Sequence, residues 1–369
     1  AADQDDWDIR RFVPPQGTNF EEVRDIEMTD GGAVWFSSWG NGVARLEKSD
    51  WEIYSTESGD LPSDFVPTLA WDPENDLMWV GTDAGLVAIL KGKAHNVPLP
   101  TALVDDSFEI SLVHRFDSGE LWIGAREGAV ISVTPAISSS GVSFSQSRGI
   151  LPMGEDHGYV VRGIVEGRDG SRWVARNRAG VMQLRDGLWT HHSDEGMGVM
   201  RSDALFEASD GTIWTSGSDS PSGFDGHEWT PIEGVVESKL LTEASDGRFY
   251  LSTVNGQIFG SSPNPFNISN PLRTRDHVLM TRVGVIKVYE GSLLWVGAKE
   301  GIFLGTRPRW RERSLHEMST GNSGNVAFYS SLSQWPMILG MRGDLMRFDP
   351  ESMGWNVLVS LPEEPGDQP

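Results

Sequence analysis

The chain has 369 residues and a formal net charge of −23, which argues against nucleic acid or an anionic membrane surface as a partner. It contains no Cys, so a disulfide framework, a thiol nucleophile and a thiolate metal site are excluded. No apolar run approaches the ~18 residues that a spanning helix needs, so we expect no membrane span. The 42 Gly, 20 Pro and 15 Trp residues are typical of many short strands separated by turns.

The chain begins with Ala1-Ala2-Asp3-Gln4. These small residues resemble the end that remains after cleavage of a signal peptide, although a recombinant chain can begin in the same way. We therefore expect a periplasmic or secreted protein.

One block recurs along the chain: an acidic residue with Gly, an apolar-Trp-apolar strand, a short loop, and a Gly followed by an apolar residue. The eight copies are centred on Trp35, Trp79, Trp122, Trp173, Trp214, Tyr250, Trp295 and Ile338. Their spacings lie between 36 and 51 residues. A period of this size with repeated turn signals predicts several short strands in each copy. One residue type repeated at one position indicates one packing environment, so Trp79, Trp122, Trp173 and Trp295 are expected to be largely buried between neighbouring repeats.

Four strands can be assigned to one period. An inner strand comes first, such as 65–70, and the Trp strand follows after a turn. A third strand begins at the later Gly, as in 85–90, and an outer strand often opens with Trp, as in 51–54. Four antiparallel strands per period predict an all-β propeller, with eight blades as the expected number and seven as the alternative.

The repeats define one propeller domain over residues 1–369. Residues 1–18 are expected to form an outer closing strand or a tail, residues 19–358 the eight repeats, and residues 359–369 a C-terminal tail. Nine outer strands compete for eight places, because the segment beginning at Trp7 precedes the first block. Either the Trp7 strand or the Trp355 strand closes the ring.

The segment 76–86 has the pattern Gly-x-Leu-Trp-Val-Gly-Thr-x-x-Gly-Leu in loose form and resembles the two-component-regulator propeller repeat. The segment 59–66, Gly-Asp-Leu-Pro-Ser-Asp-Phe-Val, leads into a blade in the same way. This resemblance implies a sensor domain outside the cytoplasmic membrane that recognises glycan fragments. We expect no cofactor.

No catalytic motif is present: the chain has no Gly-x-Ser-x-Gly elbow, phosphate loop or zinc helix. Carboxylates such as Asp64, Asp105 and Asp203 precede the inner strands, where they are expected to cap turns by accepting backbone N–H bonds. A cation held by several of them is the alternative. We therefore assign neither catalytic residues nor metal ligands.

The loops between the second and third strands are expected to open on the ligand face of the propeller. They carry five cations against three acids, a net charge of +2 in a chain that averages about −3 per repeat. Trp39 lies in one of these loops, outside the repeated Trp positions. Aromatic rings stack on sugars and Arg pairs with carboxylates. The predicted binding residues are Trp39, Arg126, Arg176, Arg178, Lys299 and Arg342.

These observations predict a non-catalytic extracytoplasmic binding or sensing propeller for a small molecule or an acidic oligosaccharide. One alternative is a propeller-type polysaccharide lyase or hydrolase that uses central carboxylates with His157 or His277. The other is a scaffold that binds a protein partner.

Overall fold

The computed structural model is all-β, as predicted. It describes residues 7–12, 20–105, 107–138, 141–151, 159–192, 202–217, 220–232, 238–245, 247–253, 255–261, 268–272, 280–289, 293–306, 327–329, 337–339, 345–349 and 354–359. The described residues contain no helix, and hence none that could cross a membrane.

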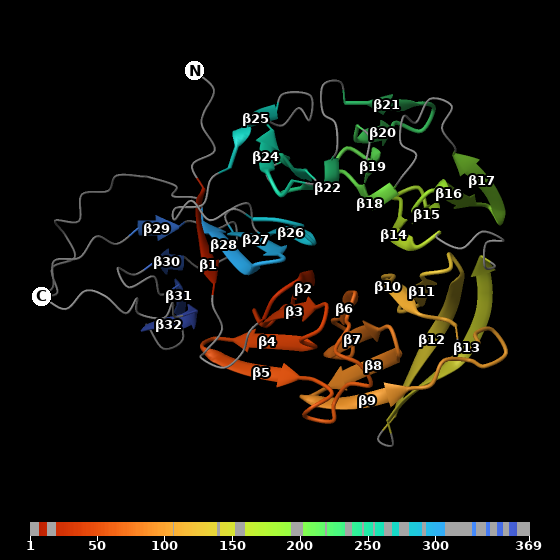
Figure 1. Ribbon diagram of the computed structural model, residues 1–369, viewed down its shortest axis with the longest axis horizontal. Helices are drawn as coiled ribbons and strands as arrows, with labels where there is room; N and C mark the ends of the chain where they lie inside the picture. The colour runs from red at the N-terminus through yellow and green to blue at the C-terminus, as the bar shows by residue number, and fades with distance from the viewer. Residues whose placement is uncertain are drawn as a thin grey trace, which may run out of the picture.

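Seven four-stranded antiparallel sheets surround a central axis (Figure 1). Blade one contains β2 (Val23–Met28), β3 (Val34–Ser38), β4 (Val43–Glu47) and β5 (Asp50–Tyr54). Blade two contains β6 (Thr68–Asp72), β7 (Leu77–Thr82), β8 (Gly85–Leu90) and β9 (Lys93–Val97). Blade three contains β10 (Ile110–Arg115), β11 (Leu121–Ala125), β12 (Val130–Ser138) and β13 (Gly141–Leu151). In each blade the first strand is innermost.

The ring continues with three more consecutive sheets and closes in the seventh. Blade four contains β14 (Val161–Glu166), β15 (Arg172–Arg176), β16 (Gly180–Arg185) and β17 (Leu188–His192). Blade five contains β18 (Ser202–Glu207), β19 (Ile213–Gly217), β20 (Ser222–Phe224) and β21 (Trp229–Pro231). Blade six contains β22 (Ser238–Glu243), β23 (Phe249–Thr253), β24 (Ile258–Ser261) and β25 (Ile268–Pro271). Blade seven contains β26 (Val285–Tyr289), β27 (Leu293–Ala298), β28 (Gly301–Thr306) and the N-terminal β1 (Asp8–Phe12).

The N-terminal strand closes the ring. β1 pairs antiparallel with β28 over its whole length, from Asp8 opposite Thr306 to Phe12 opposite Ile302. The Trp7 segment therefore takes the outer place in the last blade. Blade seven thus combines one strand from before blade one with three strands that follow blade six. The hydrogen-bonded ladder between β1 and β28 joins the first and last blades and leaves no open gap between them.

The expected count of eight blades is wrong, and the alternative of seven is confirmed. The eighth repeat forms a separate four-stranded sheet from β29 (Ala327–Tyr329), β30 (Met337–Leu339), β31 (Leu345–Asp349) and β32 (Gly354–Val359). Figure 1 shows this sheet outside the ring, beside blade seven. β1 already occupies the outer position beside β28, so no strand of the eighth repeat is needed to complete blade seven. Within the described residues, the four strands of the eighth repeat pair only with one another.

Seven apolar clusters fill the interfaces between neighbouring blades. The repeated aromatic residues Trp79, Trp122, Trp173 and Trp295 are at most 2% exposed, which confirms the predicted burial. Trp295 of blade seven contacts Phe36 of blade one, with ring centroids 5.3 Å apart. The core is therefore continuous across the junction where the ring closes.

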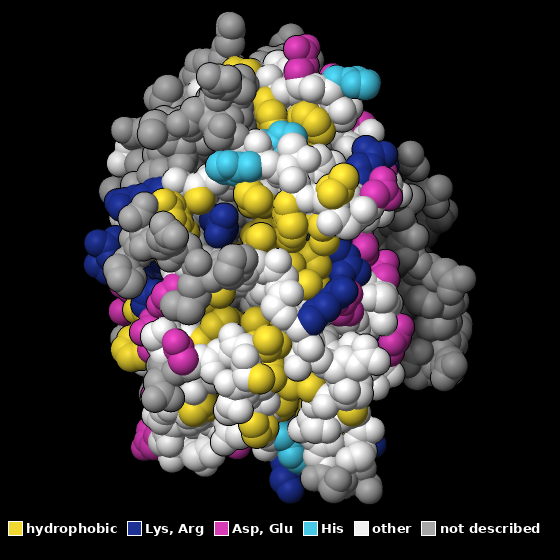
Figure 2. Space-filling model, turned by 90° about the vertical axis from the view of Figure 1, so that its right-hand side faces the viewer, with side chains coloured by type: hydrophobic (Ala, Val, Ile, Leu, Met, Phe, Trp, Pro, Cys, Tyr) yellow, Lys and Arg dark blue, Asp and Glu magenta, His cyan; other side chains and the backbone are white. Residues whose placement is uncertain are grey.

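Figure 2 shows the flank of the ring that faces right in Figure 1. Basic and acidic side chains lie side by side there, and apolar side chains lie between polar ones. Leu188, at the start of β17, is the most exposed of the large hydrophobic side chains in the described part of the chain, at 74%. The strong negative charge of the sequence thus coexists with local pairing of opposite charges.

Candidate ligand-binding site at the central opening

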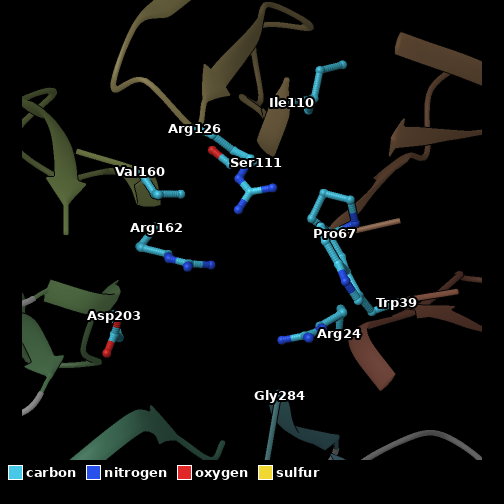
Figure 3. A pocket seen from close by; sticks show the side chains of 10 residues that line it. All are labelled: Arg24, Trp39, Pro67, Ile110, Ser111, Arg126, Val160, Arg162, Asp203 and Gly284. Atoms are coloured by element: carbon cyan, nitrogen blue, oxygen red, sulfur yellow. The ribbon is translucent and has the colours of Figure 1, made fainter. Parts of the chain in front are cut away.

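A cavity of about 380 Å³ lies where the innermost strands begin, at one mouth of the central axis. This volume is within the range of small-molecule sites in proteins. The residues that line it come from six blades and include three arginines and one tryptophan (Figure 3). They are Arg24, Trp39, Pro67, Ile110, Ser111, Arg126, Val160, Arg162, Asp203 and Gly284.

Four of these side chains reach the cavity because of β-bulges. The ladders of β2, β10, β14 and β18 with their neighbours each skip one residue at the start of the inner strand. The skipped residues are Arg24, Ser111, Arg162 and Asp203, all of which line the cavity. A bulge leaves one residue unpaired and changes the direction of its side chain. The ladder between β22 and β23 likewise skips one residue, Lys239.

The sequence carries a signal for these bulges that alternation alone does not reveal. Val23 and Ile26, Ile110 and Val113, and Val161 and Ile164 are pairs of buried residues at the start of inner strands. Residues three apart face opposite sides of a regular strand, so buried pairs at this spacing indicate one extra residue between them. The polar residue that follows the first member of each pair is the one directed to the cavity.

Trp39 lies on the wall of the cavity in a loop fixed from both sides. Its backbone N–H donates to the carbonyl of Glu22 at 3.0 Å, and it forms an isolated β-bridge with Phe65. Gly42 ends this loop at φ 69°, where an added Cβ would overlap the carbonyl oxygen of Tyr54, so the turn requires glycine. The Trp39 and Phe65 rings lie 5.2 Å apart, and Phe65 is 42% exposed.

Two arginines flank the indole of Trp39. The Cζ atoms of Arg24 and Arg126 lie 5.2 Å and 5.8 Å from the ring centroid, within cation–π range. Glu22 binds Arg24 at 3.0 Å, and Glu109 binds Arg126 at 3.0 Å. These pairs are partly exposed, so they orient the guanidinium groups more than they stabilise the fold.

The three guanidinium groups converge on one space. Figure 3 shows Arg24, Arg126 and Arg162 pointing from three different blades into the middle of the opening. The buried Nε of Arg24 has no hydrogen-bond partner within the described residues. Asp203 lies on another part of the wall, where its carboxylate accepts a hydrogen bond of 3.2 Å from Asn177. The residues that line the opening therefore carry three cations and one anion, and two of the cations, Arg24 and Arg126, are also paired with Glu22 and Glu109.

Of the six residues predicted from the sequence, Trp39 and Arg126 line the opening. Arg176, Arg178 and Lys299 do not line it. Arg176 instead lies over the ring of Tyr159 at 5.9 Å, and burial lowers its pKa. Arg342 lies outside the described residues, as do His157 and His277. Arg24, Arg162 and Ser111 also line the opening and were not predicted, because they belong to strands, whereas the prediction considered loops.

Further along the axis, charged groups of blades one and seven are paired. Lys287 donates to Glu27 at 3.0 Å, and burial opposes its charge, but the carboxylates of Glu27 and Asp25 outweigh burial and raise the pKa of Lys287. Burial raises the pKa of Asp25 to about 6, although it accepts N–H bonds from Ile26 and Leu69 at 2.9 Å. These contacts link blade one to blades two and seven.

The capping role predicted for carboxylates before the inner strands is confirmed at Asp105, which accepts bonds from the backbone N–H and the hydroxyl of Ser107. Within the described residues, no three His, Asp or Glu side chains are grouped as metal ligands.

A scan against models of protein families found no match, and a search among curated proteins found none. Solved structures do share the fold. The extracellular domain of a putative hybrid two-component system from B. thetaiotaomicron is 15% identical, with a TM-score of 0.67 over 97% of this chain and 49% of that chain. The chain thus spans about half the length of that receptor domain.

Two further neighbours illustrate the range of proteins with this fold. Virginiamycin B lyase from Staphylococcus aureus is 14% identical, with a TM-score of 0.63 over 82% of this chain and 99% of that chain. YCF48 bound to a D1 peptide is 12% identical, with a TM-score of 0.58 over 83% of this chain and 96% of that chain. The TM-scores establish that the chain shares its fold with an extracellular domain, an enzyme and a protein bound to a peptide. At identities this low the similarity concerns the fold alone.

Proposed function

We propose that this chain is a non-catalytic, extracytoplasmic binding or sensing propeller that binds an anionic ligand at its central opening. The observation that carries the proposal is the convergence of Arg24, Arg126 and Arg162 on one cavity beside Trp39. Clustered cations in a chain of net charge −23 attract an anion, and guanidinium groups bind carboxylates and sulfates in bidentate geometry.

An acidic saccharide fits this chemistry. Trp39 is partly exposed, and the 42% exposed ring of Phe65 lies beside it at 5.2 Å, so the two rings offer apolar contact beside the cations. Sugar rings pack on such surfaces while their acidic groups meet arginine. The fold neighbour from a two-component receptor is an extracellular domain, which supports a sensing role outside the cytoplasm.

The test compares acidic and neutral oligosaccharides by calorimetry, using the parent chain, Arg126→Gln and two control variants. Each charge-assisted hydrogen bond contributes roughly 1.5–3 kcal/mol, so Arg126→Gln should weaken binding about tenfold to a hundredfold. Arg178→Gln and Lys299→Gln remove cations that do not line the opening and should leave affinity unchanged. Affinity should fall as salt rises, because the site is open to solvent.

Equal binding of neutral sugars, or an unchanged affinity of Arg126→Gln, would refute the proposal. Prolonged incubation with the acidic ligands addresses the second candidate function, an enzyme, which the similarity to virginiamycin B lyase favours. New chain ends or an unsaturated product would establish the enzyme in place of the binding protein. Saturable binding without turnover supports the sensor.

A further inference from the structure

The wall of the central opening carries charges of both signs. Arg24 and Arg126 flank Trp39 on one side, whereas Arg162 and Asp203 lie on the other (Figure 3). Three blades contribute guanidinium groups, from Arg24, Arg126 and Arg162, and a different blade contributes the carboxylate of Asp203. Figure 3 shows Asp203 across the cavity from Arg24 and Trp39. The bulges at Arg24, Arg162 and Asp203 present one charge per blade at equivalent positions of the repeat. The charge pattern of the opening is thus set by the residue at one position of each inner strand.

Asp203 is not neutralised by the protein where it meets the cavity. Its carboxylate accepts one hydrogen bond, of 3.2 Å, from the buried side chain of Asn177, and within the described residues it has no ion-pair partner. A ligand that fills the cavity removes water from this carboxylate. Removing water from a charged group is unfavourable unless the ligand supplies a hydrogen-bond donor or an opposite charge.

A ligand that carries only negative charge would satisfy the arginines and be repelled by Asp203. A ligand with an ammonium group on the side away from its anionic group would satisfy both walls. Specificity depends on the difference between the affinity for the ligand and the affinity for its competitor. A site that binds both ends of a zwitterion and repels one end of a dianion therefore selects the zwitterion.

We propose that the opening selects zwitterionic ligands, with the anionic group held by Arg24 and Arg126 beside Trp39 and an ammonium group held by Asp203. This inference rests on the proposed function, because it requires an anionic group to bind at Arg24 and Arg126. It adds a second chemical requirement that the arginines alone do not impose.

The experiment uses probes of equal length that differ only at the far end: hexanoate, adipate and 6-aminohexanoate, with the four-carbon and eight-carbon sets covering shorter and longer separations. Binding of each to the full chain is measured by calorimetry at low salt. In at least one set, the amino acid should bind about tenfold more tightly than the simple carboxylate, since a hydrogen bond between charged groups is gained. The dicarboxylate should bind more weakly than the simple carboxylate.

Two variants separate this inference from the proposed function. Asp203→Asn keeps the size of the side chain and its contact with Asn177, and it should remove the preference for the amino acid while the simple carboxylate binds as before or better. Arg126→Gln should weaken all probes by the same factor. An unchanged urea unfolding midpoint shows that each variant is folded.

The outcomes are distinct. If simple carboxylates and amino acids bind equally in every set, or Asp203→Asn keeps the preference, the zwitterion requirement is refuted and anion binding stands. If none of the probes and none of the acidic saccharides bind, the proposed function fails, and this inference fails with it.

Discussion

Glu120 is the clearest case in which one side chain joins two blades. It precedes β11, and its carboxylate accepts hydrogen bonds from four donors in blades three and four. The donors are the indole of Trp122 at 3.2 Å, the hydroxyl of Ser132, the guanidinium of Arg148 at 3.2 Å and the guanidinium of Arg172 at 2.6 Å. Arg172 in turn lies over the Phe116 ring at 4.0 Å and binds Glu166 at 3.1 Å. Trp122, Ser132 and Arg148 donate to Oε1, and Arg172 donates to Oε2. We expect Glu120→Gln to destabilise the fold, because either the three donors on Oε1 or Arg172 on Oε2 would face an amide N–H₂ that cannot accept.

The size of this effect follows from the pKa of Glu120. Burial raises it, but the bonds from Ser132 and Arg172 outweigh burial and lower it from 4.5 to about 2. A tenfold change in the acid dissociation constant corresponds to about 1.4 kcal/mol, so the lowered pKa corresponds to about 3 kcal/mol, and partial solvent screening reduces this to about 2 kcal/mol. A lowered carboxyl pKa contributes stability above pH 4.5 that is lost as the pH falls from 4.5 toward 2.

Urea unfolding followed by tryptophan fluorescence at pH 7 and pH 3 measures the effect. At pH 7, Glu120→Gln should cost about 2 kcal/mol, and at pH 3 the difference between variant and parent should shrink. Glu47→Gln is the matched control, because Glu47 pairs with Arg45 but is 44% exposed, so its loss should cost less than about 1 kcal/mol at either pH. Equal losses for Glu120→Gln and Glu47→Gln, or a difference that does not shrink in acid, would refute the reasoning.

Two further predictions concern the ring. Trp295→Ala should lower the free energy of unfolding by about 3–5 kcal/mol, because Trp295 is 2% exposed and packs against Phe12 and Phe36 where the ring closes. The control is Leu188→Ala, at a 74% exposed position, which should lower it by less than about 0.5 kcal/mol in the same urea titration. A small loss for Trp295→Ala would contradict closure between blades seven and one. Burial and the nearby charges of Lys287 and Arg172 lower the pKa of His114 from 6.5 to about 4, so the parent should lose about 2 kcal/mol of stability between pH 7 and pH 5, and His114→Leu should lose markedly less. Equal losses in both proteins would show that His114 does not set this slope.

The sequence by itself determined the strands, the repeat and the aromatic residues that pack between neighbouring blades. The Asp-Gly turns, the alternating apolar residues and the Trp at one position of each repeat are local signals, and they act over a few residues. They predicted four strands per repeat and the burial of Trp79, Trp122, Trp173 and Trp295, because one residue type repeated at one position indicates one packing environment. They also located Trp39 and Arg126, since each stands in a loop whose place in the repeat is known.

The tertiary structure alone decided how many repeats enter the ring and which charges meet. Eight repeats are present in the sequence, but β1 pairs with β28 and closes the ring after seven, because closure depends on which distant strand occupies the last outer edge. The central cations were decided in the same way. Arg24 and Arg162 reach the opening through bulges in strand pairing, and Arg178 and Lys299 stand in loops that do not reach it, because the direction of a side chain depends on the ladder that holds its strand.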